Sequence, residues 1–192
     1  RAHEAYSRIF RRAGLKNFID VESDSGMIGG SVSHEFMEHT PDGEDTLIIC
    51  KGCGYRANKE IATTPFLPSQ EPLEEMKKVP TPGQKTIEEV SQFLGVTQAQ
   101  TAKAVFYVHN NKTLVFALIR GDIEVNENKL GKVLGAGELR PAHDEEIVAA
   151  GAVPGYASPV GLDPKGFTLI VDPSVTICQN LVTGANEEAA HY

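Results

Sequence analysis

Five prolines within residues 64–85 constrain the fold of this 192-residue chain more than any other feature. Proline has no backbone N–H to donate in a helix or a central strand, so a stretch this rich in proline interrupts regular structure. We therefore predict a linker at 64–85, between a first part at 1–63 and a second part at 86–192. The five are Pro65, Pro68, Pro72, Pro80 and Pro82.

Composition narrows the class of protein. The hydrophobic content of 41% and the charged content of 23% are typical of a soluble globular protein. No apolar run reaches the ~18 residues of a membrane-spanning helix, so no membrane partner is expected. The net charge of −8 disfavours a protein that holds nucleic acid tightly. The chain begins at Arg1, within a helical pattern and without a methionine, which we interpret as the pattern of a fragment.

The cysteines indicate a compartment rather than a site. Three cysteines without a disulfide spacing favour a reducing cytosol, so we expect a cytoplasmic protein. Cys50-x-x-Cys53 supplies only half of a structural zinc site, and Cys178 lies in a different segment. We therefore predict no metal.

The first part combines a helix with short strands. Residues 2–14 have the apolar spacing of an amphipathic helix, and Gly14 is its predicted end. Strands are expected near 19–24, 27–37 and 45–50, separated by turn residues such as Pro41-Asp42-Gly43.

The second part alternates helices with strands, which predicts an α+β domain with a mixed or antiparallel sheet, or a partial barrel, flanked by helices. Thr86 and Glu89 form a capping box that begins a helix ending at Gly95. Asn110-Asn111 is a hairpin turn signal. The expected strands are 101–109, 112–120, 167–172 and 176–183, and the other expected helices run from a cap at Asn126 through Leu134 and over 142–150.

Two charged residues are candidates for substrate binding. Lys103 lies where a turn becomes a strand, between the small residues Ala102 and Ala104. An ordinary solvated lysine is the alternative. Asp172 ends the strand FTLIVD, where a carboxylate can bind an ammonium group. An Asp-Pro turn is the alternative there.

A loop and a histidine complete the candidates. Gly155 and Pro159 bound the loop Gly-Tyr-Ala-Ser-Pro, in which glycine permits close approach of a ligand and proline fixes the backbone. A surface turn is the alternative. His191 follows Gly184-Ala185-Asn186 and can hydrogen-bond a substrate or act as acid or base. A structural or frayed terminal histidine is the alternative.

Residues 21–60 carry a series of landmarks in order at natural spacing. Together they resemble the class II catalytic core of bacterial-type prolyl-tRNA synthetases, and the resemblance covers residues 1–63. The arginines of motifs 2 and 3 and the anticodon-binding domain have no counterpart, so no aminoacylation is expected. The landmarks are Asp24-Ser25-Gly26, Ile28-Gly29-Gly30, Ser33-His34-Glu35-Phe36-Met37, Gly43-Glu44-Asp45 and Cys50-x-x-Cys53-x-Tyr55-x-x-Asn58.

Residues 86–192 resemble the insertion domain of the same synthetases, a member of the YbaK-like deacylase superfamily. This resemblance implies editing, the hydrolysis of alanine from the tRNA for proline, with roles for Lys103, Gly155, Pro159, Asp172 and His191. No cofactor is implied for editing; ATP and Mg, and a homodimer, belong to the full-length synthetase. The residues that carry the resemblance are Lys103, Arg120-Gly121-Asp122, Asn126-Glu127, Lys129-Leu130, Gly155 to Pro159, Asp172, Gly184-Ala185-Asn186 and His191.

The expected mechanism is direct attack of water on the aminoacyl ester, because the sequence shows no nucleophile with its base. The N–H groups of the 155–159 loop would stabilise the oxyanion. Lys103 would bind the terminal phosphate or ribose, and Asp172 would bind the α-ammonium group. His191 would line the amino-acid pocket. Two alternatives stay open: a non-catalytic tRNA-docking module, and a free-standing deacylase for another misacylated tRNA.

Overall fold

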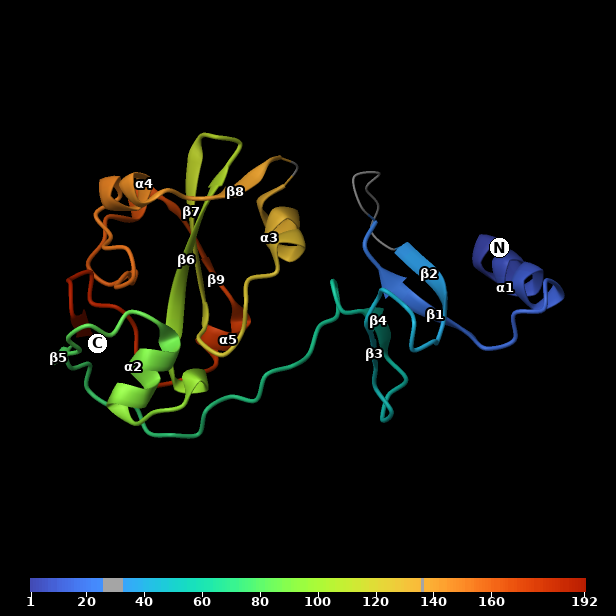
Figure 1. Ribbon diagram of the computed structural model, residues 1–192, viewed down its shortest axis with the longest axis horizontal. Coiled ribbons are helices and arrows are strands. Elements are labelled where there is room, and N and C mark those ends of the chain that lie inside the picture. Colours follow the sequence, from blue (N-terminus) through green and yellow to red (C-terminus); the bar gives the residue numbers. More distant parts are fainter. Residues whose placement is uncertain (26–32, 136) are drawn as a thin grey trace. The chain divides into compact units, whose positions relative to one another are not determined.

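In a computed structural model the chain forms two compact units, Arg1–Thr64 and Pro65–Tyr192 (Figure 1). The structure describes residues 1–25, 33–135 and 137–192. Across these ranges, no helix combines the length and the apolar character needed to cross a bilayer.

In its described residues, the first unit contains one helix and a four-stranded sheet in the order β2-β1-β4-β3. The predicted helix is confirmed, and Gly14 follows it with φ +95°. The strands predicted near 19–24 and 45–50 are present, and β2 confirms residues 33–37 of the strand predicted at 27–37, whose residues 27–32 lie outside the described residues. The elements are α1 (Ala2–Arg12), β1 (Phe18–Ser23), β2 (Ser33–Glu38), β3 (Leu47–Ile49) and β4 (Arg56–Asn58).

Aromatic rings attach α1 to this sheet. Phe10 on the helix packs against Phe18 of β1 and Phe36 of β2, with ring centroids 5.8 and 5.3 Å apart. Of the described residues in this unit, only Val21 and Ala57 are apolar side chains that are fully buried. The first unit therefore has a small core.

The second unit is built on a sheet in the order β8-β6-β7-β9. β6 (Ala102–His109) and β7 (Thr113–Arg120) form the predicted hairpin. Asn110 and Asn111 both have positive φ, 54° and 53°, as a two-residue hairpin turn requires. β9 (Thr168–Val171) lies parallel to β7 and β8 (Leu139–Pro141) antiparallel to β6, so the sheet is mixed, as predicted.

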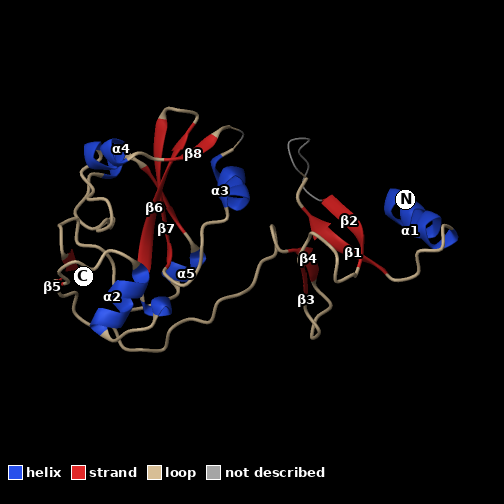
Figure 2. Ribbon diagram, in the orientation of Figure 1, coloured by secondary structure: helices blue, strands red, loops and turns tan. Residues whose placement is uncertain are grey.

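Helices cover both faces of the sheet (Figure 2). Alternate strand residues separate the faces: Phe106 and Phe116 pack with Ile147 of α4, whereas Tyr107 and Val115 pack with Leu130 of α3. This arrangement confirms the α+β class. The helices are α2 (Ile87–Leu94), α3 (Glu127–Leu134), α4 (Asp144–Ala149) and α5 (Pro173–Thr176), with 3-10 turns at Gln98–Gln100 and Pro164–Gly166.

The predicted helix boundaries rest on caps that the structure contains. Thr86 and Glu89 form the capping box of α2, and Gly95 ends it in the left-handed region at φ 69°. The Asn126 side chain accepts from the Lys129 N–H at the start of α3.

The strand predicted at 176–183 is wrong. Asp172 caps a short helix and Pro173 occupies its first turn, where the missing N–H of proline is harmless. The chain then runs irregularly. Within residues 177–183, Val182 forms an isolated β-bridge with Thr101, which directly precedes β6. The β-branched residues of this stretch suggested a strand, but the cap and the proline determine the local structure.

The proline-rich stretch packs within the second unit. The Ser69 N–H donates to the Ile177 carbonyl at 2.9 Å. β5 (Val79–Pro80) pairs antiparallel with β10 (Ala190–His191). β5 lies at the edge of this two-stranded ladder, where proline is tolerated. The 64–85 segment is therefore held to the second unit at both of these points.

Candidate functional site

A band of hydrogen-bonded segments links the parts of the chain that carry the candidate residues. It begins at β5 and passes to β10, where His191 bridges Gly184. Val182 then bridges Thr101 at the start of β6, and β6 pairs with β7. The end of the chain is thereby placed beside the beginning of the central hairpin.

Lys103 and Asp172 lie at one end of the central sheet. Lys103 is opposite Ile119 on β7, and Asp172 directly follows the β9 residue that pairs with Leu118. This register places Lys103 and Asp172 on either side of β7, about 10 Å apart at two strand spacings. The structure thus brings these two predicted residues to the same sheet end.

Lys103 is neither free nor fully solvated. Its side chain is 18% exposed, and Nζ lies 2.6 Å from Oε1 of Glu124, whose own side chain is 88% exposed. The Glu124 carboxylate is surrounded by solvent, so a phosphate group could take its place beside the ammonium group.

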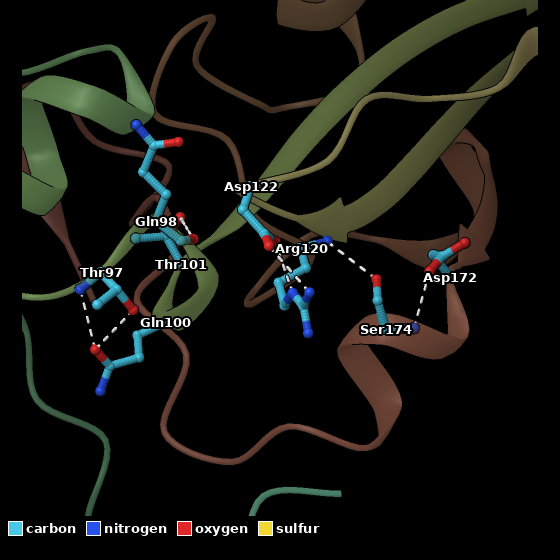
Figure 3. A network of polar contacts seen from close by, with 8 residues as sticks. All are labelled: Thr97, Gln98, Gln100, Thr101, Arg120, Asp122, Asp172 and Ser174. Carbon is cyan, nitrogen blue, oxygen red and sulfur yellow. Dashed lines mark hydrogen bonds and ion pairs between the residues drawn. The ribbon is translucent and has the colours of Figure 1, made fainter. Parts of the chain in front are cut away.

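Asp172 caps α5. Its Oδ1 accepts from the Ser174 N–H at 2.8 Å, which is the turn role that the sequence offered as the alternative (Figure 3). Its Oδ2 has no hydrogen-bond donor within the described part of the chain. One carboxylate oxygen therefore remains for a ligand.

Arg120 and Asp122 brace this sheet end. The guanidinium donates to both carboxylate oxygens, at 2.6 and 3.0 Å, and this hydrogen bonding holds the pKa of Asp122 below its usual value. The Arg120 N–H donates to Ser174 Oγ at 3.3 Å, which connects the pair to α5 (Figure 3). Between them, a Cβ at Gly121 would lie 1.9 Å from Thr101 Oγ1, so only glycine fits.

The loop from Gly155 to Pro159 is clamped by Asn186. The Asn186 Oδ1 accepts from the Ser158 N–H at 3.0 Å, and Nδ2 donates to the carbonyls of Ser158 and Val160 at 2.8 Å. Gly155 has φ +83°, and Ser158 is fully buried. The loop and the Gly184–Asn186 segment are thus one structure, and the surface-turn alternative does not describe it.

Only two loop N–H groups remain for a ligand. Tyr156 donates to the Val153 carbonyl, Ser158 donates to Asn186, and Pro159 has no N–H. The N–H groups of Gly155 and Ala157 have no acceptor among the residues that the structure describes.

Gly184 packs directly on this loop. A Cβ at this position would lie 2.1 Å from the Tyr156 carbonyl oxygen and 2.7 Å from the Ala157 nitrogen. The absence of a side chain at Gly184 therefore permits the close contact between the two segments.

His191 is a fixed part of this region. It is 5% exposed, its Nδ1 shares a hydrogen bond of 2.6 Å with Thr81 Oγ1, and its ring meets that of Tyr156 edge to face at 5.6 Å. Burial lowers the pKa of the imidazole, so the ring is neutral at pH 7. The His191 side chain is therefore not frayed, and a structural role remains the alternative to a role in the site.

Two hydroxyl groups in this region had no signal in the sequence. Thr81 is fully buried but lies in the proline-rich stretch, where no periodicity predicts a partner. Thr183 Oγ1 is buried without a hydrogen-bond partner, and the Thr183 backbone pairs with Tyr192 beside His191. An unpaired buried hydroxyl is a possible contact for a bound ligand.

The candidate residues thus form two groups. The first contains the 155–159 loop, His191 and Thr81, and the second contains Lys103 and Asp172. The described side chains show no hydrogen bond or ion pair between the groups; the backbone band connects them. The described cavity of about 280 Å³ is elsewhere, beside the hairpin turn and α4, and contains none of the predicted residues.

Sequence relatives are proline–tRNA ligases, and two solved structures share the fold. Proline–tRNA ligases of Salinispora tropica and Dehalococcoides mccartyi are 47% and 46% identical over 98% of this chain, which spans about a third of their length (33% and 32%). A crystal structure of a hypothetical protein is similar at a TM-score of 0.54, with 25% identity, over 60% of this chain and 77% of that one. A second crystal structure, of a candidate trans-editing enzyme for prolyl tRNA synthetase, shares the fold at a TM-score of 0.52 and 24% identity. The match covers 60% of this chain and 73% of that one.

The family model for the aminoacyl-tRNA editing domain matches residues 81–192. The match begins at Thr81 and includes His191, so it contains both partners of the buried hydrogen bond. The chain belongs to the aminoacyl-tRNA editing domain family.

Proposed function

We propose that the second unit hydrolyses the ester of a misacylated tRNA, with alanine on the tRNA for proline as the substrate. The observation that carries this is the neutral, buried His191, fixed by Thr81 beside a loop with two unused N–H groups. The name of the two relatives reported above, proline–tRNA ligase, supports proline as the identity of the tRNA.

In the proposed reaction, water attacks the ester carbonyl and the ribose oxygen leaves. In this reaction the N–H groups of Gly155 and Ala157, which have no acceptor among the described residues, would stabilise the developing oxyanion, and donors of this kind are typically worth several kcal/mol. The site needs no nucleophilic side chain because the aminoacyl ester is already reactive, and it needs no cofactor.

The charged group at the sheet end binds the rest of the substrate. Lys103 exchanges Glu124 for the terminal phosphate or ribose, and the free oxygen of Asp172 receives the α-ammonium group. Both interactions orient the ester before water attacks.

His191 limits the size of the amino acid. Each extra methylene changes binding by only ~1–3 kcal/mol in a complementary pocket, so the exclusion of proline needs a rigid wall. An imidazole held by Thr81 and Tyr156 is such a wall.

For the first unit, we propose that it is part of a class II synthetase core in a cytoplasmic enzyme. ATP, Mg and a homodimer belong to that whole enzyme rather than to editing. The landmarks in residues 21–60 and the match of the ligases over 98% of this chain support the assignment.

A deacylation assay tests the proposal with alanyl-tRNA and prolyl-tRNA as substrates. We expect hydrolysis of the first, a large loss of rate in Lys103→Ala, and new cleavage of prolyl-tRNA in His191→Ala. Lys112→Ala, an exposed lysine at the far end of the hairpin, is the matched control. If the folded chain binds the tRNA but releases no alanine, it is a docking module; if it cleaves only another misacylated tRNA, the assigned substrate is wrong.

A further inference from the structure

Three metal-ligating side chains converge on the first unit, outside the editing region. They come from α1, β1 and β2: His3, Asp20 and His34. His3 Nε2 lies 2.5 Å from Asp20 Oδ2, and His34 Nδ1 lies 3.0 Å from Asp20 Oδ1. Their potential ligand atoms all lie within 4.8 Å of one another.

We propose that His3, Asp20 and His34 bind a divalent transition-metal ion, with Zn²⁺ as the representative. Two imidazoles and one carboxylate form a ligand set that suits Zn²⁺ and its neighbours, with water completing the coordination. The ion would lie between the ring nitrogens and the carboxylate oxygens that now contact one another directly.

The backbone and the neighbouring rings hold these ligands in place. Asp20 pairs with Phe36 in the β1–β2 ladder and His34 pairs with Glu22, so Asp20 and His34 are diagonal neighbours on one sheet face. The His3 ring lies 5.5 Å from that of His34 and 5.2 Å from that of Phe36. Ligands held in this way need little rearrangement to bind an ion.

A bound ion has a structural role here. His3 lies in the first turn of α1, whereas the other two ligands are on the sheet, so the ion joins the helix to the sheet. This unit buries only Val21 and Ala57 as apolar residues among those described. Small cores of this kind are often stabilised by a metal.

The test is a titration of the whole 192-residue chain with Zn²⁺, followed by calorimetry and thermal unfolding. Cys50 and Cys53 are first replaced by serine, because an exposed thiol pair takes the same ion. We expect one ion per chain and a rise in the Tm of the first unit. His3→Gln, Asp20→Asn and His34→Gln should each weaken binding at least tenfold.

His39→Gln is the matched control, an exposed histidine in the same unit that does not belong to the group. It should bind Zn²⁺ as the parent chain does. Since His3 is half exposed at the start of a helix, His3→Gln leaves the fold intact and keeps the test decisive. The proposal is overturned if millimolar Zn²⁺ does not bind, or if His3→Gln and His39→Gln bind it equally well.

Discussion

The hydrogen bond between Thr81 and His191 joins two positions that are 110 residues apart. Neither residue alone indicates its role, because a threonine in a proline-rich stretch and a histidine near a chain end are ordinary features. Together they form a buried polar pair, in which the loss of one partner leaves the other unsatisfied. The orientation of the His191 ring therefore depends on Thr81.

At this scale we predict that Thr81→Val reduces discrimination between alanyl-tRNA and prolyl-tRNA by about tenfold, from the loss of one buried hydrogen bond of ~1–1.5 kcal/mol. The valine keeps the shape of the side chain and removes only the hydroxyl. The ratio of the two hydrolysis rates is the measurement. Thr81→Ser keeps the hydroxyl group and should retain the parent ratio. An unchanged ratio in Thr81→Val would show that packing alone orients the His191 ring.

The lowered pKa of His191 predicts a loss of stability in mild acid. The unfolded chain binds the proton at its ordinary pKa of about 6.5, before the buried ring does. Stability is therefore complete above that pH and falls as the pH decreases toward the lower pKa of the folded state. We expect Tm to drop less between pH 7.5 and 5 in His191→Asn than in the parent chain, with His143→Gln, an exposed histidine, as the control. An equal drop in Tm in the parent chain and in His191→Asn would contradict the prediction.

Elements with local signals could be predicted from the sequence, whereas elements made by distant pairing could not. The capping box of Thr86 and Glu89, the Asn126 cap, the Asn110-Asn111 turn and Gly95 each act within a few residues, and α2, α3 and the hairpin are present as predicted from them. β4, β5, β8 and β10 are only two or three residues long, and the partners of β5, β8 and β10 are remote in sequence. No periodicity can reveal strands this short.

The same distinction between local signals and distant contacts applies to the candidate site. The residue types of Lys103, Asp172 and His191 identified them, and the local Asp-Pro turn was one of the two alternatives for Asp172. The sequence did not reveal Glu124 and Thr81 as the partners of Lys103 and His191. Contacts between distant segments depend on tertiary register, which a single sequence does not contain. The assigned roles of these residues stay predictions.

For α2, we predict that Thr86→Ala lowers the stability of the second unit by about 1 kcal/mol, the usual cost of losing an N-cap side chain. Thr86 Oγ1 accepts from the Glu89 N–H at 3.2 Å, and alanine leaves that donor without a partner in the protein. Denaturant unfolding measures the change. Thr86→Ser should retain most of the stability, and an equal loss in the serine variant would point to the methyl group instead of the cap.

At the scale of the whole molecule, all of the candidate editing residues belong to the second unit. We therefore predict that residues 65–192 alone hydrolyse alanyl-tRNA at a rate within a few-fold of the whole chain. Single-turnover assays at matched concentrations provide the measurement. Circular dichroism checks that the shortened chain is folded, and a folded but inactive product would show that the first unit contributes to the reaction.

The antiparallel pairing of β5 with β10 places the entry and the exit of the editing fold one strand spacing apart, about 4.8 Å. A host protein could accept this fold within a single surface loop without opening its own framework, because both attachment points meet at one place. His191 lies on β10 and Thr81 directly follows β5, so the residue that we propose as the size filter lies at this joint.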